Sequence, residues 1–356
     1  MHVRVSTNRY VYEFDLERRV TVIRGDSGTG KTLLANLLVA EPETGVHVEC
    51  ERSFVLMNNN IRVNYSTWFK DYDNVVFILD EDSRWLRDRR FYDAALDSGA
   101  WLLVMDRSTL LTTYECSVES VMRLKVSGKY RTLEKLYTHK STTFPKDWPV
   151  FTEDTGSGYS FMQKVRDKVA PLGGKDLLDN LTPNELYGKI YFMDGAAYGH
   201  KLHAYYNDWL KGRIEFILPE SFEWVLLHSP QFSQYTEVRN MLADPVAYGA
   251  NKTEYKTWEN FFTWFIHDFT TRMWIKGYSK TSDIRCFTEP CCAQNRPCDL
   301  KYTRTKDKVL DTLEACGLLN LYNKDNCIVD ELWEKLPKAL QQQDDKLSIL
   351  RQLGLL

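Results

Sequence analysis

Residues 20–32 read Val20-Thr21-Val22-Ile23-Arg24-Gly25-Asp26-Ser27-Gly28-Thr29-Gly30-Lys31-Thr32, and no other stretch constrains the architecture as strongly. The first five residues are mostly apolar and β-branched, which predicts a buried strand. A glycine-rich turn follows, and residues 32–39 have the composition of a helix. Glycines let the backbone approach a phosphate closely, and a helix N-terminus attracts its negative charge. The stretch therefore predicts a phosphate-binding strand–turn–helix unit.

The turn matches the pattern G-x-x-x-x-G-K-[ST] at every fixed position. Eight residues are candidates for binding a nucleotide: Gly25, Asp26, Ser27, Gly28, Thr29, Gly30, Lys31 and Thr32. In this pattern the ammonium group of Lys31 reaches the β- and γ-phosphates, and the hydroxyl of Thr32 ligates Mg²⁺.

A second apolar run, Val75–Leu79, ends in Asp80 and Glu81. Continuous apolar runs of this length are typical of strands buried on both faces. Asp80 is the candidate for the Mg²⁺ shell, and Glu81 is the candidate that orients or activates the attacking water. The two motifs, in this order, resemble the Walker A and Walker B motifs of P-loop NTPases. The resemblance implies ATP and Mg²⁺ as ligands.

Strands alternating with helices predict a parallel sheet in an N-terminal domain, residues 1–112. A further expected strand, 101–105, is followed by Asp106, Arg107 and Ser108. Additional-strand ATPases carry a polar sensor residue at this place, and Asp106 and Ser108 are the candidates. Four arginines after the second motif are candidates for a finger that completes a neighbouring subunit's site, with surface charge as the default: Arg84, Arg87, Arg89 and Arg90. The ATPase class implies a homo-oligomer.

Residues 113–148 are rich in Lys and Arg, and a Pro-containing stretch at 144–149 ends them. We interpret this segment as a basic linker. A solvated face is the favoured interpretation of its charge, and a surface that contacts phosphates is the alternative.

Residues 149–232 alternate again and predict a second α/β domain. Three acids stand at or just after expected strand ends: Glu153, Asp194 and Glu220. The carboxyl ends of neighbouring parallel strands converge at one edge of a sheet. Clustered carboxylates bind Mg²⁺ or Mn²⁺, which can activate water for phosphodiester cleavage. Glu153 and Asp194 are therefore the candidate catalytic and metal-binding residues, with Glu220 or Glu223 completing the shell.

The order of these elements looks like the TOPRIM fold of topoisomerases, primases and OLD-family nucleases. That family has a Glu after its first strand and Asp-x-Asp after its third. Here the third strand is followed by Asp194-Gly195-Ala196, so the second Asp is missing. Two alternatives stay open: an active nuclease, and a degenerate domain that binds without cutting.

OLD-type proteins also carry an ATPase ahead of the TOPRIM domain. The resemblance thus implies ATP-gated, metal-dependent cleavage of nucleic acid, DNA rather than RNA, in defence against phage or mobile DNA. The alternative is a nucleotide-dependent switch or scaffold that binds a partner protein. A P-loop kinase that phosphorylates a nucleotide or another small molecule is a third and weaker hypothesis.

Residues 233–356 are expected to be mostly helical. Five aromatic residues fall on one face of a helix and predict core packing: Trp258, Phe261, Phe262, Phe265 and Phe269. Closely spaced cysteines, Cys286, Cys291 and Cys298 with Cys292 between them, are candidates for a structural Zn²⁺ site. Their spacing is not that of common zinc ribbons, so reduced thiols are favoured.

The chain has 356 residues, a net charge of −3 and 27% charged residues, which excludes a disordered or coiled-coil protein. The slightly negative net charge does not indicate an overall positive surface of the kind that binds nucleic acid. The first residues do not read as a signal peptide, and no apolar run is long enough to span a membrane. We expect a cytoplasmic protein without a membrane partner.

Overall fold

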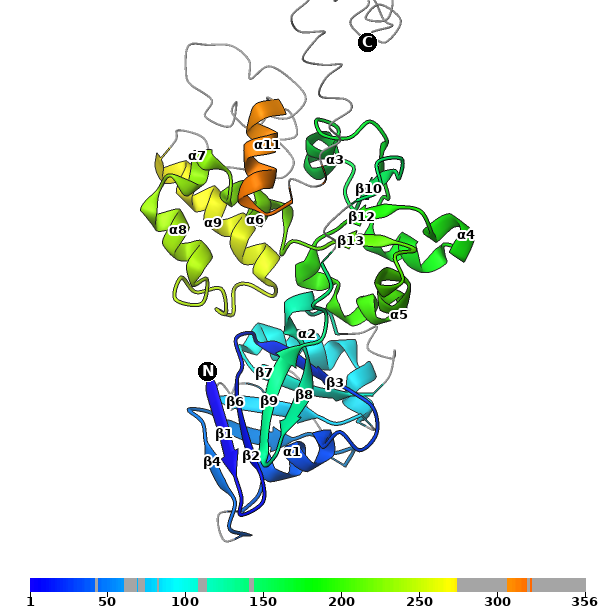
Figure 1. Cartoon of the computed structure of the whole chain (residues 1–356). Coiled ribbons are helices and arrows are strands. Elements are labelled where there is room, and N and C mark those ends of the chain that lie inside the picture. Colours follow the sequence, from blue (N-terminus) through cyan, green and yellow to red (C-terminus); the bar gives the residue numbers. More distant parts are fainter. Residues whose placement is uncertain are drawn as a thin grey trace, which may run out of the picture.

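The computed structural model describes residues 1–41, 44–60, 69, 74–81, 83–107, 114–140, 144–273, 306–318 and 321. The protein is an α/β protein with a large mixed sheet, a smaller parallel sheet and several helices (Figure 1). We call the part built on the large sheet the first lobe, the part built on the smaller sheet the second lobe, and α6–α9 with α11 the helical lobe. Among the described residues, no helix is long and apolar enough to cross a membrane.

The first lobe holds a nine-stranded sheet in the order β4-β1-β2-β9-β8-β3-β7-β6-β5. Its strands are β1 (His2–Ser6), β2 (Val11–Asp15), β3 (Val20–Arg24), β4 (His47–Glu49), β5 (Ser53–Leu56), β6 (Val75–Leu79), β7 (Trp101–Asp106), β8 (Val121–Ser127) and β9 (Tyr130–Lys135). Strands β8, β3, β7, β6 and β5 are parallel, whereas β1, β2 and β4 pair antiparallel, as do β8 and β9. The prediction of a parallel sheet is therefore right for its centre, and the whole sheet is mixed.

Two helices cover opposite faces of the central strands, α1 (Lys31–Leu38) and α2 (Arg89–Ser98). Successive side chains of a strand point to opposite faces, so each strand contributes to two cores. In β7, Leu103 packs into the cluster with Leu34 of α1, and Leu102 packs into the cluster with Phe91 of α2. Burial on both faces explains why these central strands are apolar throughout.

The segment expected to be a basic linker contains β8 and β9, which corrects the boundary predicted at residue 112. Leu124 and Leu133 are opposite each other and pack against the core, which ties the hairpin to the sheet. Arg123 and Lys125 point to the exposed face and pair with Glu134. The basic residues are thus the solvated face of a hairpin.

The second lobe is built on a parallel sheet in the order β11-β10-β12-β13. Its strands are β10 (Val150–Thr152), β11 (Val169–Pro171), β12 (Ile190–Phe192) and β13 (Glu215–Ile217). Its helices are α3 (Ser157–Met162), α4 (Pro183–Leu186) and α5 (Gly199–Leu210), with short 3-10 helices at Lys175–Asn180 and Gly195–Ala197.

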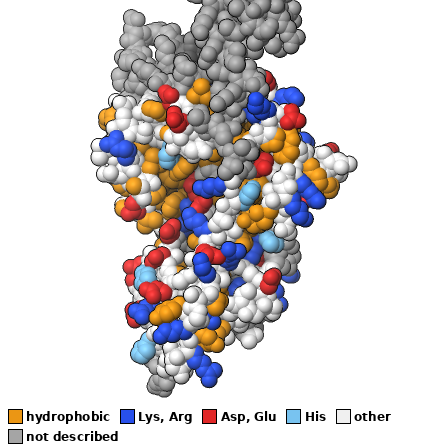
Figure 2. Space-filling view, viewed as in Figure 1, with side chains coloured by type: hydrophobic (Ala, Val, Ile, Leu, Met, Phe, Trp, Pro, Cys, Tyr) orange, Lys and Arg blue, Asp and Glu red, His pale blue; other side chains and the backbone are white. Residues whose placement is uncertain are grey.

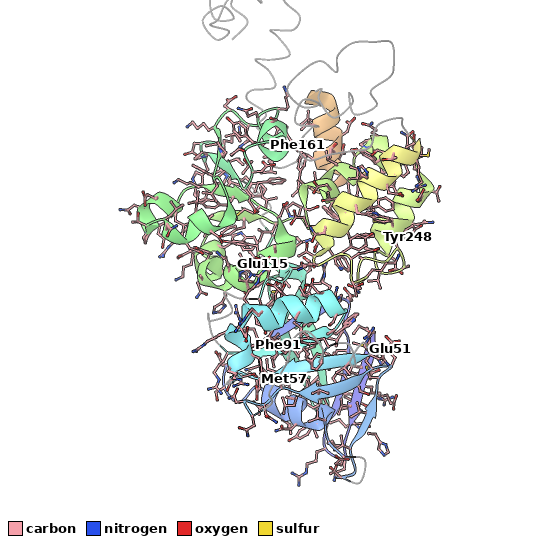
Figure 3. All side chains as sticks on the ribbon, turned by 180° about the vertical axis from the view of Figure 1, so that it is seen from behind. Glu51, Met57, Phe91, Glu115, Phe161 and Tyr248 are labelled. Carbon is pink, nitrogen blue, oxygen red and sulfur yellow. The ribbon has the colours of Figure 1, made fainter. Side chains whose placement is uncertain are left out.

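The helical lobe contains α6 (Phe222–Leu227), α7 (Pro230–Ser233), α8 (Thr236–Ala243), α9 (Trp258–Met273) and α11 (Lys306–Ala315). The predicted aromatic stripe lies on α9, and its four Phe side chains are buried in the core that this lobe shares with the second lobe. Seen from behind, Phe161 of the second lobe and Tyr248 of the helical lobe lie in the two upper parts of the molecule (Figure 3).

The first and second lobes share one continuous core, in which Val22 and Phe77 cluster with Tyr198 and Phe216. Glu115 marks the junction between the lower and upper parts of the molecule (Figure 3). Just after it, Cys116 accepts a hydrogen bond through its carbonyl from the backbone N–H of Gly199, at 2.8 Å. Such a shared core holds the two lobes together more firmly than a polar interface would.

Candidate functional site

The glycine-rich turn connects β3 to α1 and leaves the N-terminus of α1 open. Gly28 and Gly30 have φ angles of 83° and 96°, a left-handed conformation that favours glycine. No side chain caps the helix, and its first turn contains no acidic residue. Its first backbone N–H groups therefore lack a side-chain acceptor and can bind an anion.

Lys31 is the first residue of α1, and its side chain folds back into the turn. Its Nζ donates to the backbone carbonyls of Gly25 and Asp26, the latter at 3.1 Å. Burial lowers the pKa of Lys31, and the nearby negative charge of Glu81 opposes that shift. The ammonium group thus lies inside the turn, within electrostatic range of the second motif.

Asp80 and Glu81 follow β6, and β7 lies between β6 and the strand that leads into the turn. All three strands are parallel, so their carboxyl ends meet at the same edge. The Oδ1 atom of Asp80 accepts the backbone N–H of Glu81 at 2.9 Å. The structure therefore brings the two sequence motifs to one site, with Thr32 exposed in the first turn of α1.

Arg107, the residue after β7, forms a two-pronged ion pair with Glu81 in this site. Its Nε donates to Oε2 of Glu81 at 2.7 Å, and its Nη2 donates to Oε1. The sequence interpretation passed over Arg107 and selected its neighbours. Arg107 directly follows a buried strand that ends at the same sheet edge as the two motifs. This position is the sequence signal that could have identified it as a site residue.

Asp106, one of the two predicted sensor residues, faces the protein interior instead. Its Oδ2 accepts two hydrogen bonds from Arg24, at 2.9 and 2.6 Å, and both side chains are about 4% exposed. Arg24 also donates to the hydroxyl of Tyr137 at 3.1 Å, and the ring of Tyr137 packs edge-on against Tyr206 of α5. Asp106 is thus part of a buried network that reaches the second lobe. Ser108, the other candidate, lies outside the described residues.

The second lobe brings Glu153 and Asp194 together at the carboxyl edge of its sheet. The backbone N–H of Asp194 donates to Oε2 of Glu153 at 3.0 Å, and Oδ1 of Asp194 accepts the N–H of Phe222 at the start of α6. A Cβ at Gly195 would lie 2.7 Å from the carbonyl oxygen of Leu218, so only glycine fits after Asp194. The carboxylates of Glu153 and Asp194 therefore each accept a backbone hydrogen bond that holds a nearby loop in place.

Glu220 does not complete a metal shell with these acids. Its carboxylate accepts hydrogen bonds from both terminal nitrogens of Arg18, at 3.0 and 2.7 Å, and from the hydroxyl of Ser117 at 3.1 Å. Arg18 and Ser117 belong to the first lobe, so Glu220 joins the two lobes. Ala196, where the TOPRIM pattern has its second Asp, lines the same junction.

Within the described residues, no group of three or more His, Cys, Asp or Glu side chains is arranged to hold a metal ion. Cys286, Cys291 and Cys298 lie outside those residues, and so does Cys327. Burial raises the pKa of Cys316 to about 12, and its Sγ lies 3.8 Å from the carbonyl oxygen of Val225. Cys316 is therefore a protonated thiol packed in the helical lobe.

The second lobe contains another polar cluster, which the sequence does not reveal. Lys201 of α5 pairs with Asp176 at 2.6 Å and with Asp179 at 2.5 Å, and the hydroxyl of Tyr205 donates to Asp179 at 2.7 Å. The acids lie in a 3-10 helix and the lysine in α5, so no sequence spacing connects them.

None of the known protein-family models, curated proteins or solved structures matches the chain. The site therefore has to be interpreted from its own geometry. In the first lobe it offers an open helix N-terminus, an ammonium group, a carboxylate beside a backbone amide, and a carboxylate held by a guanidinium. Together these groups are able to bind a polyphosphate and direct water toward it.

Proposed function

We propose that the protein binds and hydrolyses ATP with Mg²⁺ at the site where the carboxyl ends of β3, β7 and β6 meet. The observation that carries this proposal is the convergence of Lys31, Asp80 and Glu81 at an uncapped helix N-terminus. Strand β7, between β3 and β6, supports the resemblance to additional-strand ATPases. The backbone amides of the turn and Lys31 would bind the β- and γ-phosphates, and Glu81 would orient the attacking water.

The residues present fit a magnesium ion delivered with the nucleotide. Mg²⁺ usually takes only one or two protein ligands and fills its octahedron with phosphate oxygens and water. Thr32 and Asp80 are such ligands, so a cluster of three acids is not required. When bound, the ion neutralises charge that develops on the phosphates.

A nucleotide titration tests the proposal directly. We expect a fluorescent ATP analogue to bind the purified protein with Mg²⁺, and unlabelled ATP to displace it. Phosphate release should follow saturation kinetics and stop when EDTA removes the magnesium. Absence of binding by both ATP and GTP at millimolar concentration would refute the assignment.

A second candidate function, metal-dependent cleavage of nucleic acid, is favoured by the contact between Glu153 and Asp194. Within the described residues, however, no third acid gathers with these two to hold a metal ion. On the face shown in Figure 2, acidic and basic side chains are interspersed over the first lobe, and no large patch of a single sign is visible there. The engagement of Glu220 by Arg18 favours the alternative, a nucleotide-dependent switch in which the second lobe binds a partner.

Cleavage assays separate these two functions of the second lobe. If the second lobe is a nuclease, we expect nicking of plasmid DNA with Mg²⁺ or Mn²⁺, and a loss of about 100-fold or more in Glu153→Ala because an ionised metal ligand is removed. Glu254→Ala, an exposed acid in the helical lobe, is the matched control. Assays with linear DNA and RNA, with and without ATP, identify the substrate. Equal cleavage by wild type and Glu153→Ala would exclude this site.

A further inference from the structure

Among the described residues at the proposed ATP site, Arg107 contributes a guanidinium group that neither sequence motif contains. It pairs with both carboxylate oxygens of Glu81, as described above. The Glu81 side chain is 17% exposed, and that of Arg107 is 50% exposed. We propose that Arg107 is a positioning residue for ATP hydrolysis, which holds the carboxylate of Glu81 in the orientation that aligns the attacking water. This inference rests on the proposed function.

The two hydrogen bonds from Arg107 fix the side chain of Glu81, whose conformation the backbone does not determine. Asp80 already fixes the amide of Glu81, but three side-chain torsions remain at a sheet edge that faces solvent. A planar guanidinium that donates two parallel hydrogen bonds sets the plane of a carboxylate as well as its position. The rotational freedom of Glu81 is therefore lost before the substrate arrives, which lowers the entropic cost of alignment.

The ion pair leaves Glu81 able to contact water. An ionised carboxylate offers about four lone-pair positions, and the two bonds from Arg107 use two of them. Phosphoryl transfer depends mainly on positioning and electrostatic stabilisation and needs little proton abstraction from the protein. The Glu81 carboxylate, paired with Arg107, can thus still orient the nucleophile.

Arg107 also competes with Lys31 for the carboxylate of Glu81. Burial is the main cause of the lowered pKa of Lys31; of the two nearby charges, that of Glu81 raises this pKa and that of Arg107 lowers it. Without Arg107, the uncompensated carboxylate would attract the ammonium group that must reach the phosphates. The pair with Arg107 therefore leaves each group to its own task.

Arg107→Ala tests this assignment through its coupling to Glu81. We expect kcat to fall by about 10- to 100-fold, as for a misplaced reacting group, with Kd for ATP and ADP changed by less than about twofold. Arg107→Lys should recover part of the loss, because an ammonium group makes a single contact with the carboxylate. In a Glu81→Gln background, removing Arg107 should change single-turnover hydrolysis by less than about twofold. Arg213→Ala, whose side chain is also 50% exposed and pairs with an acid, Asp208, in the second lobe, is the matched control.

Two results would overturn the assignment. The same loss of rate in the wild-type and Glu81→Gln backgrounds would mean that Arg107 acts on the phosphates without Glu81. Faster hydrolysis by Arg107→Ala would mean that the pair restrains the enzyme. Failure of the proposed function is distinct, because then the wild type itself shows no hydrolysis that depends on Lys31.

Discussion

Lys31→Ala should lower kcat for ATP hydrolysis by about 100- to 1000-fold, the loss typical of removing one preorganised charge from a transition state. The ammonium group already lies inside the turn, held by the carbonyls of Gly25 and Asp26. Phosphates that enter the turn would take over these contacts. The alanine variant would keep the backbone amides, so nucleotide affinity should weaken while turnover is almost lost.

The stability of Lys31→Ala separates this effect from misfolding. Burial lowers the pKa of Lys31, so the folded protein disfavours the charged form relative to the unfolded chain. At neutral pH the charge itself therefore does not stabilise the nucleotide-free protein, so the variant should still fold, which its melting temperature checks. Saturating MgATP at about 100 times Kd should stabilise the wild type by about 2.7 kcal/mol and the variant much less.

Lys256→Ala, a half-exposed lysine far along the chain, is the matched control for these measurements. It should retain wild-type hydrolysis and the wild-type thermal shift. Hydrolysis by Lys31→Ala at the wild-type rate would contradict the assignment of the nucleotide site to this turn.

The strands that lie at the centre of the sheets could be predicted from the sequence. Val20–Arg24 and Val75–Leu79 have the predicted bounds, because burial on both faces leaves a continuous apolar run. Strands β1 and β2 were missed, since they alternate exposed charges with buried residues and belong to the antiparallel part of the sheet. In β8 the exposed side chains of Arg123 and Lys125 alternate with the partly buried Leu124. This alternation predicts a strand, but the segment was interpreted from its positive charge alone.

The two halves of the candidate site differ in predictability for a physical reason. The phosphate-binding turn is local, so its eight residues and the context of strand and helix appear together in the sequence. The partners of acids in the second lobe are not local. Glu220 pairs with Arg18, which is 202 residues away, and nothing in the spacing identifies such a contact. Arg107 is intermediate, because the strand before it is predictable and the direction of its side chain is not.

Asp106→Ala should destabilise the protein by about 3–5 kcal/mol, because it leaves the guanidinium of Arg24 buried without its carboxylate. The two side chains are almost fully buried and joined by two hydrogen bonds. Their strands are adjacent, with Arg24 opposite Asp106, and the N–H of Gly25 donates to the carbonyl of Asp106 at 3.3 Å. The pair thus fixes the point where the phosphate-binding turn begins, and urea denaturation measures its contribution.

Two comparisons decide whether burial of an unpaired charge causes this loss. The double variant Arg24→Met with Asp106→Leu removes both charges and should regain most of the stability, because apolar replacements avoid the desolvation penalty. Asp93→Ala breaks an exposed Arg–Asp pair on α2, whose side chains are 50% and 40% exposed, and should cost less than about 0.5 kcal/mol. Equal unfolding midpoints for Asp106→Ala and Asp93→Ala would show that the buried pair is not what holds the turn. Failure of the double variant to recover would show instead that the hydrogen bond from Arg24 to Tyr137 carries the stability.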